Sequence, residues 1–277
     1  MDQTRKALAF QALHQQDKPF IIPNPWDAGT ARMLAALGFA ALATTSAGLA
    51  FSLGRRDAEG ALSRDETLAN AKSIVEASEL PVAADLENGF GDAPEVVADT
   101  IRLAADIGLV GGSIEDASGN AARPIYDFNH SVERIAAAAE MARRLPFPFM
   151  LAARAENFLH GKPDLDDTIR RLQAYEAAGA DVLFAPGLPD ADAIRAVCSA
   201  VSKPVNVVMG LKGKHYSVTQ LAELGVRRIS LGSSLSRAAL SGFMRAAQEL
   251  VDSGTFSFAN DILTFAEVNA MMQPGKQ

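Results

Sequence analysis

The sequence predicts a (β/α)₈ barrel of the TIM type with an extra C-terminal helix, and two features support this class. Eight short apolar runs alternate with eight stretches whose apolar residues recur at helical spacing. The apolar runs are nearly continuous, which is typical of parallel strands that are buried on both faces. The length of 277 residues suits one barrel domain that spans residues 1–277.

The predicted strands and helices alternate along the whole chain. The strands are FIIPN (from Phe20), AALATTS (from Ala40), PVAADLE (from Pro81), GGSIED (from Gly111), FMLAARAE (from Phe149), ADVLFAP (from Ala180), PVNVVM (from Pro204) and RRISLGS (from Arg227). The helices cover residues 26–38, 64–78, 93–108, 131–145, 165–179, 190–201, 217–225 and 233–250. Several of these helices end at glycine, as helices commonly do.

A doubly wound open sheet is the rival architecture. It would more often carry a glycine-rich dinucleotide-binding loop after its first strand, and PNPWDAGT is not such a loop. No linker or change in composition marks a second domain. Residues 255–277 form a tail with one further amphipathic helix, FANDILTFAEVNAMM, which could pack on a neighbouring subunit or on its own barrel.

The composition limits the partners and the location of the protein. With 26 basic and 33 acidic residues the net charge is −7, whereas nucleic-acid binding needs clustered Lys and Arg. The single cysteine, Cys198, excludes an internal disulfide framework and a cysteine-rich metal site. The N-terminal residues do not resemble a signal peptide, and no apolar run approaches the about 20 residues that span a bilayer. We therefore expect a cytoplasmic protein without a nucleic-acid or membrane partner.

Acidic residues gather at the ends of the predicted strands, where barrels of this class carry their active sites. These ends bring six acids against one cation, Arg154; the acids are Asp57, Asp85, Glu87, Glu115, Asp116 and Glu156. So many like charges cannot all ionise in one cleft without a counterion. A divalent cation held by carboxylates and water, such as Mg²⁺, is the simplest counterion.

Asp85 and Glu87 are the first candidates to hold this cation. They stand two residues apart, and side chains two apart on a strand point to the same side. A carboxylate at the end of an apolar strand is costly unless a cation meets it. The competing interpretation is that strand-end acids cap the following helices, and we favour it for Asp92 and Asp116.

Five motifs together resemble the isocitrate lyase/phosphoenolpyruvate mutase superfamily. They are NPWDAGTARMLAALGF, TTSAGLAFSLGRRD, ADLENGFGD, SIED and ARAENF, and the similarity runs from about Pro23 to Ser234. The resemblance implies a (β/α)₈ barrel and a Mg²⁺-bound oxo acid or enolate, with Mn²⁺ as a possible substitute. It also implies a homo-oligomer, usually a tetramer, in which a C-terminal helix swaps between subunits.

The resemblance also implies roles for individual residues. Asp85 would bind the metal directly, and Glu87, which replaces the family's second aspartate, would act through metal-bound water. Glu115 and Asp57 would complete the surroundings of the metal. A substrate carboxylate would be bound by a segment of strand two and by Arg154; the segment is Ser46, Ala47 and Gly48. Asn206, on the seventh predicted strand, is a further candidate for substrate binding.

Two departures from the family narrow the reaction. Isocitrate-type lyases carry a K-[KR]-C-G-H loop after strand four, and here IEDASGNAARPIYDFNHS contains neither Cys nor Lys. Phosphonate-handling members place His and Ser at the end of strand six, where this chain has Ala185 and Pro186. Asn120 could stand where those members keep a loop asparagine. Both a typical isocitrate lyase and a phosphonomutase are therefore disfavoured.

The favoured function is a Mg²⁺-dependent carbon–carbon lyase or decarboxylase that acts on a small 2-oxo or hydroxy dicarboxylate through a metal-stabilised enolate. The alternatives are a phosphonate enzyme of the mutase or hydrolase type and a non-catalytic oxo-acid binder. Glu156, His215 and Tyr216 are the candidate acid–base residues, beside Arg154 and Glu115. His160, Lys212, Lys214 and residues 232–234 are weaker candidates, each of which an ordinary polar loop or helix cap also explains.

Overall fold

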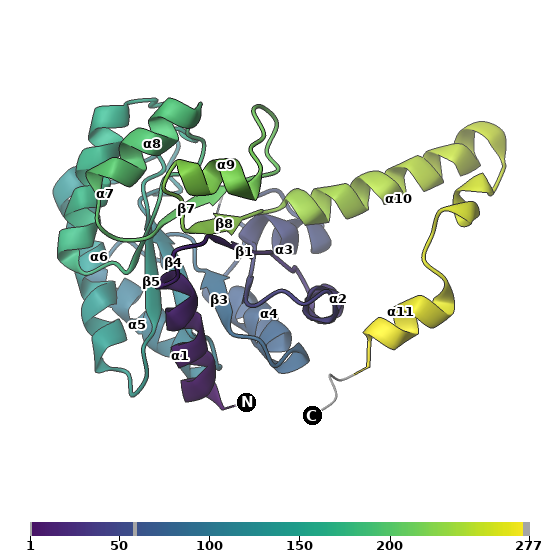
Figure 1. The fold of residues 1–277 in the computed structure, drawn as a ribbon, viewed down its shortest axis with the longest axis horizontal. Helices are drawn as coiled ribbons and strands as arrows, with labels where there is room; N and C mark the ends of the chain where they lie inside the picture. The colour runs from purple at the N-terminus through teal and green to yellow at the C-terminus, as the bar shows by residue number, and fades with distance from the viewer. Residues whose placement is uncertain (1, 58–59, 274–277) are drawn as a thin grey trace.

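The computed structural model describes residues 2–57 and 60–273, and it contains an almost closed barrel of eight parallel strands surrounded by helices (Figure 1). The strands follow one another in the order β1-β8-β7-β6-β5-β4-β3-β2. Between β1 and β2 the backbone N–H of Ala43 donates to the carbonyl oxygen of Pro23 at 3.0 Å. The predicted (β/α)₈ class is confirmed.

The eight predicted strands are all present, each within its expected segment. Their bounds are β1 Phe20–Ile22, β2 Leu42–Ala43, β3 Val82–Asp85, β4 Gly111–Glu115, β5 Met150–Arg154, β6 Val182–Phe184, β7 Val205–Val208 and β8 Arg228–Ser230. The eight predicted helices are present too. They are α2 Ala28–Ala36, α4 Arg64–Ala77, α5 Pro94–Asp106, α6 Phe128–Arg144, α7 Leu165–Ala178, α8 Ala191–Ala200, α9 Val218–Glu223 and α10 Ser234–Ser253.

Side-chain caps fix the start of many of these helices. In α4 the Ser63 side chain accepts from the N–H of Glu66, whose carboxylate accepts from the N–H of Ser63, and this reciprocal pair forms a capping box. Asp27 and Thr30 form the same arrangement at α2. These caps set the residue at which each of the two helices begins.

Two helices were not predicted from the sequence. Helix α1 (Gln3–His14) covers the N-terminal end of the barrel, where the ring of Phe10 lies against Gly111 at the start of β4. Helix α3 (Ser46–Ser52) begins directly after β2, with Thr45 as its N-cap. The chain therefore forms a short helix at the end of β2 where an extended loop was expected.

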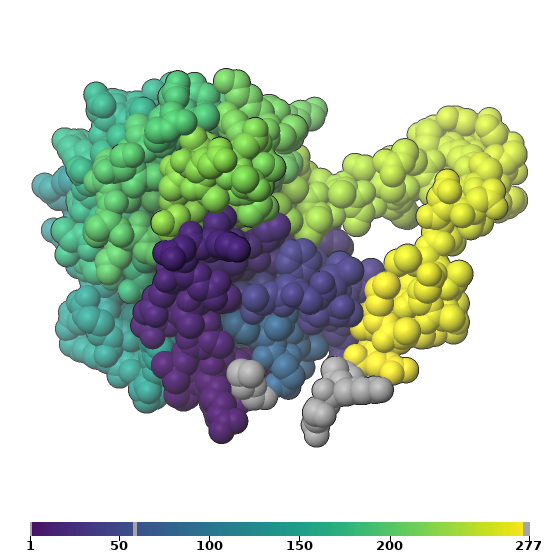
Figure 2. Space-filling model, viewed as in Figure 1, coloured from purple at the N-terminus to yellow at the C-terminus, as the bar shows by residue number. Residues whose placement is uncertain are grey.

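The C-terminal segment leaves the barrel as an arm. Helix α10 extends away from the body, and the chain then turns back toward α2 (Figures 1 and 2). The tail was expected to form a single helix, but it forms a 3₁₀ turn at Ser257–Asn260 and a separate helix α11 at Phe265–Met271. The side chain of Arg32 holds the end of the arm by donating to the carbonyl oxygen of Met272 at 2.7 Å.

Large apolar side chains of this arm face solvent. Phe243 is 67% exposed, Val251 80% and Phe265 85%, whereas Ser236 is the buried residue of α10. Within residues 2–57 and 60–273, no helix is both long enough and apolar enough to cross a membrane. Residues 274–277 of the predicted tail lie outside the described part of the chain.

Candidate active site

Arg154, the last residue of β5, stands at the centre of a charged cluster at the C-terminal end of the barrel. Its guanidinium contacts three carboxylates from three strand ends: Nη1 lies 3.0 Å from Asp85, Nη2 3.1 Å from Glu115, and Nε 2.8 Å from Glu156. Strands β3, β4 and β5 are neighbours in the sheet, which explains why these acids converge although 69 residues separate Asp85 from Arg154.

Asp85 is held from several sides. Its Oδ2 accepts from both the backbone N–H and the hydroxyl of Ser46, at 3.2 and 2.9 Å. Its Oδ1 accepts from Arg154 and, at 3.3 Å, from the N–H of Glu87. The carboxylate thus joins the start of α3 to β3 and β5.

Glu87 stands in a left-handed backbone conformation, with φ of 47°, directly after β3. Its carbonyl oxygen accepts from the N–H of Glu115 at 2.9 Å, which fixes this conformation against β4. Burial, together with the negative charges of Asp85 and Asp57, raises the pKa of the Glu87 carboxyl to about 7 against the opposing effect of Arg154. Its ionised form therefore needs more positive charge than Arg154 supplies.

Two further glutamates of the cluster, Glu115 and Glu156, also have raised pKa values. Burial raises the pKa of Glu115 well above its usual range, although Arg154 acts in the opposite direction. Burial also raises the pKa of Glu156, with Arg154 again opposing it. Burial alone would lower the pKa of Arg154, but the surrounding carboxylates outweigh it and raise that pKa well above its ordinary value.

Two cavities meet the charged cluster. The first, of about 250 Å³, lies in the barrel mouth, and Ser46, Ala47, Asp57, Asp85 and Arg154 are among its lining residues. The second, of about 820 Å³, lies outside β3 and β4 and is lined by Glu87, Glu115 and His160 among others. The mouth cavity is large enough to hold a small oxo acid.

Some predicted site residues line neither cavity. Gly48 is buried beneath the mouth, where a Cβ would lie 2.6 Å from a methyl carbon of Thr45 and 2.9 Å from the Cβ of Trp26. Glu156 is buried behind Arg154. Asn206 is buried too, and its amide is engaged by Arg228 and Ser230.

The predicted loop residues after β7 lie apart from the carboxylates. Tyr216 lines a separate cavity of about 180 Å³ together with Lys212 and Lys214, and His215 is exposed. Burial lowers the pKa of His160, the histidine that lines the 820 Å³ cavity. Of the two remaining histidines, His14 is buried and His130 contacts the carbonyl oxygen of Asp92.

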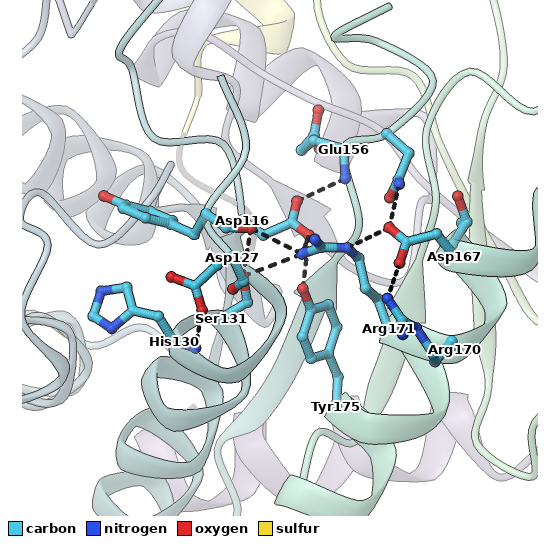
Figure 3. A network of polar contacts seen from close by, with 12 residues as sticks. Asp116, Asp127, His130, Ser131, Glu156, Asp167, Arg170, Arg171 and Tyr175 are labelled. Carbon is cyan, nitrogen blue, oxygen red and sulfur yellow. Dashed lines mark hydrogen bonds and ion pairs between the residues drawn. The ribbon is translucent and has the colours of Figure 1, made fainter. Parts of the chain in front are cut away.

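Asp116 belongs to a buried network below the cluster, which the sequence did not reveal (Figure 3). It was expected to cap a helix. Instead its Oδ2 accepts from Tyr175 at 2.7 Å and from Arg171 at 3.1 Å, and its Oδ1 accepts from the N–H of Glu156 at 2.8 Å. Burial raises the pKa of Asp116. The network therefore anchors the backbone at the end of β5 to helix α7.

Asp92 does not cap a helix either. Helix α5 begins after Ala93 without a side-chain cap, and the Asp92 carboxylate accepts from the hydroxyl of Tyr126. The ENGFGD loop that contains Asp92 is fixed by Arg134, whose guanidinium donates to the carbonyl oxygens of Asn88, Gly91 and Asp92. This support holds Glu87 and its neighbours in place.

The carboxylates around Arg154 offer oxygen ligands to a cation, but they do not by themselves form a complete coordination site. Among residues 2–57 and 60–273, no three His, Cys, Asp or Glu side chains already gather in an arrangement that could hold a metal ion by themselves. A site of this kind would need water or substrate oxygens as additional ligands. Mg²⁺ is usually bound in this way, with few protein ligands.

Comparisons with known proteins agree with this fold. The family model "Phosphoenolpyruvate phosphomutase" matches residues 10–251. A 2-methylisocitrate lyase from Shewanella oneidensis is 30% identical over 89% of this chain and 86% of its own length. An uncharacterised protein of Mycobacterium tuberculosis is 33% identical, covering 88% of this chain and 90% of its own.

A solved structure is also similar to this chain in sequence and in fold. The crystal structure of a candidate lyase/mutase from Burkholderia cenocepacia J2315 is 59% identical, with a TM-score of 0.96 over 99% of this chain and 98% of that chain. The chain therefore belongs to the isocitrate lyase/phosphoenolpyruvate mutase superfamily, a group of lyases and mutases that act on oxo acids.

Proposed function

We propose that the protein is a divalent-metal-dependent carbon–carbon lyase or decarboxylase that acts on a small 2-oxo or hydroxy dicarboxylate. The observation that carries this proposal is the excess of carboxylates around Arg154, beside a cavity of about 250 Å³. Relatives named 2-methylisocitrate lyase and oxaloacetate decarboxylase, the latter 28% identical, support the same class of reaction.

The donor set fits a cation such as Mg²⁺ or Mn²⁺. Asp85, Glu87 and Glu115 offer hard carboxylate oxygens, and the raised pKa values of the two glutamates reflect burial and neighbouring negative charge, which a bound cation would offset. Asp85 already accepts four hydrogen bonds, so it would hold the cation in place of one of these donors. When bound, the cation would supply Lewis-acid stabilisation of negative charge on the oxo oxygen.

The surrounding residues would orient the substrate. Ser46 and Ala47 line the mouth cavity at the first turn of α3, where backbone N–H groups face a carboxylate favourably. Arg154 uses three of its five N–H groups on Asp85, Glu115 and Glu156, which leaves two for a substrate carboxylate. Glu156 would keep Arg154 in this orientation.

Among the described residues, neither a cysteine nor a histidine lines the mouth cavity, and this favours loss of CO₂. Loss of CO₂ needs no general acid to break the bond, only a proton for the enolate carbon afterwards. Cys198, the one cysteine in the sequence, lies on α8, where burial raises its pKa to about 11. The end of β6 presents Ala185 and Pro186, which offer no side-chain donor or acceptor to a phosphonate.

A thermal-shift panel tests the proposal. Oxaloacetate, 2-oxoglutarate, malate derivatives and isocitrate would each be added with and without Mg²⁺ to the native protein, to Asp85→Ala and to Asp106→Ala. At least one ligand should stabilise the native protein and the exposed-site control Asp106→Ala only when Mg²⁺ is present. That shift should vanish in Asp85→Ala, and the absence of any metal-dependent shift in the native protein would refute the proposal.

A phosphonate enzyme is the second candidate. It is favoured by the name of the matching family model and by a candidate phosphonomutase from Burkholderia cenocepacia J2315, whose structure is 36% identical with a TM-score of 0.80. Phosphorus NMR with phosphonopyruvate decides between the two. An unchanged spectrum after incubation with the protein and Mg²⁺ removes this candidate.

We also infer that the arm formed by α10 and α11 packs on another subunit of a homo-oligomer. The exposed rings and aliphatic side chains of the arm, such as Phe243 and Val251, would lose their contact with water in that assembly. A monomeric protein seldom exposes so many large apolar groups on one extended segment.

A further inference from the structure

Arg228, the first residue of β8, is a buried cation that contacts no carboxylate within residues 2–57 and 60–273. It is 6% exposed, and its Nε donates to Oδ1 of Asn206 at 2.9 Å. Neither of its Nη groups has an acceptor among the described residues. Arg171 contacts two carboxylates, and Arg134 donates to three backbone carbonyl oxygens, so Arg228 differs from the other buried arginines.

The position of Arg228 connects it to the proposed site. It lines the same cavity of about 250 Å³ as Asp85 and Arg154. Arg228 lines this cavity from β8, which lies four strands away from β4 in the strand order and therefore on the opposite side of the barrel. One part of the cavity therefore carries carboxylates, and another carries a guanidinium that no carboxylate of the described residues contacts.

The contacts of Arg228 fix its orientation. Asn206 accepts from Nε, and the Nδ2 of Asn206 in turn donates to the hydroxyl of Ser230 at 3.0 Å. The Nη1 and Nη2 groups are left as a planar pair of donors, which matches the two oxygens of a carboxylate. Burial, together with the charge of Arg154, lowers the pKa of Arg228 to about 10. At neutral pH the group is nevertheless charged.

We infer that Arg228 binds the distal carboxylate of the substrate and determines the preference for dicarboxylates over monocarboxylates. This inference rests on the proposed function, because it takes the oxo-acid end of the substrate to lie at the carboxylate side of the cavity. Because Nη1 and Nη2 of Arg228 have no acceptor among the described residues, an entering carboxylate gains a charge-assisted hydrogen-bonded pair there. A monocarboxylate would place a methyl group there instead, and the guanidinium of Arg228 would gain no carboxylate.

Paired ligands that differ only at the distal end provide the test. The binding of 2-oxoglutarate and of 2-oxopentanoate would be measured by calorimetry in the presence of Mg²⁺. The proteins would be the native chain, Arg228→Met, Arg228→Lys and Arg227→Met. Arg227 is the matched control, because it precedes β8 and lies near Cys198 rather than in the cavity.

The native chain and Arg227→Met should bind the dicarboxylate about tenfold or more tightly than the monocarboxylate. In Arg228→Met this ratio should fall to near one, while the affinity for 2-oxopentanoate changes by less than about threefold. Arg228→Lys keeps the charge without the paired donors and should retain part of the preference; it also replaces the Met variant if that variant does not fold. A ratio that survives in Arg228→Met, or equal weakening of both ligands, would overturn the inference.

The readout separates this inference from the proposed function. It compares two affinities within one protein, so it needs no turnover and no identified substrate. Metal-dependent cleavage could fail while the affinity ratio of 2-oxoglutarate to 2-oxopentanoate still falls in Arg228→Met. In that case the assigned reaction is wrong and the carboxylate subsite stands. If cleavage succeeds and the ratio is unchanged, then the role of Arg228 is wrong.

Discussion

The guanidinium of Arg154 reaches across β4 to lie 3.0 Å from the carboxylate of Asp85 on β3, and this ion pair joins the two sides of the charged cluster. Each partner is more than four-fifths buried at its side chain. Such a pair is costly to break, because the remaining partner stays buried without its counter-charge.

The first prediction concerns the loss of Arg154. Arg154→Met leaves Asp85, Glu115 and Glu156 without their shared cation, so the free energy of unfolding should fall by about 3–5 kcal/mol at neutral pH. Urea unfolding measures this loss. Because protonation neutralises the unpaired carboxylates, the loss should shrink as the pH is lowered. Arg170→Met, at an exposed guanidinium on α7, should change stability by less than about 0.5 kcal/mol, and a similarly small effect for Arg154→Met would contradict the account.

The buried network around Asp116 gives a second prediction. Tyr175→Phe removes one donor from Asp116 but leaves Arg171 and the N–H of Glu156, so the expected loss of stability is about 1–2 kcal/mol. Asp116→Ala should cost more, because Tyr175 and Arg171 both lose this partner. Chemical denaturation of both single variants and of the double variant measures the coupling. Additive losses in the double variant would show that Tyr175 and Asp116 do not act as a pair.

The buried histidine of α1 gives a third prediction, about pH. His14 lies edge-on to Phe10 and Phe20, and burial lowers its pKa from 6.5 to about 3. Between these pH values the unfolded chain binds more protons than the folded one, so stability that is complete above pH 6.5 is lost as the pH falls. From pH 7 to pH 5 this group should cost about 2 kcal/mol.

The check is the pH dependence of urea unfolding in His14→Phe, which should lack this contribution. His215→Phe, at an exposed loop position, serves as the control and should keep the pH dependence of the native protein. An unchanged slope between pH 7 and pH 5 in His14→Phe would argue against a neutral buried imidazole.

The exposed arm gives a fourth prediction. The double variant Phe243→Glu, Met244→Glu places two negative charges on α10. This surface is the one that we infer to be an interface between subunits. Light scattering coupled to size-exclusion chromatography should then report a smaller assembly than that of the native protein. Leu8→Glu, at an exposed position on α1, is the control and should leave the assembly unchanged. A native protein that is already monomeric at micromolar concentration would contradict the inferred assembly.

Much of the fold could be predicted because each βα unit carries its own signals. A nearly continuous apolar run followed by an amphipathic helix recurs eight times, and the barrel follows from their order. Helix α1 escaped detection because its buried positions, among them Ala7, Phe10 and His14, include polar residues and leave Leu8 exposed. Helix α3 has only seven residues, too few for a helical period to stand out from the end of β2.

The site could be predicted only in part. The convergence of Asp85, Glu115 and Arg154 follows from the rule that parallel strands end at the same edge of a barrel. The partners of Asp116 come from α7, and contacts between a strand end and a distant helix depend on packing that no local pattern encodes. For Arg227 and Arg228 the sequence did not reveal which guanidinium points into the barrel, because an adjacent pair fits either orientation of the strand.

The most direct test of the proposed reaction is turnover of oxaloacetate, 2-methylisocitrate and substituted malates, measured as oxo-acid release and corrected for the metal-catalysed background without protein. We predict that at least one of these acids is cleaved, that EDTA abolishes the activity, and that Mg²⁺ restores it. The rate should drop by about 100-fold or more in Asp85→Asn. Cleavage that persists in EDTA, or no cleavage of any of these acids by the folded, Mg²⁺-supplied protein, would contradict the assignment of a metal-dependent lyase or decarboxylase.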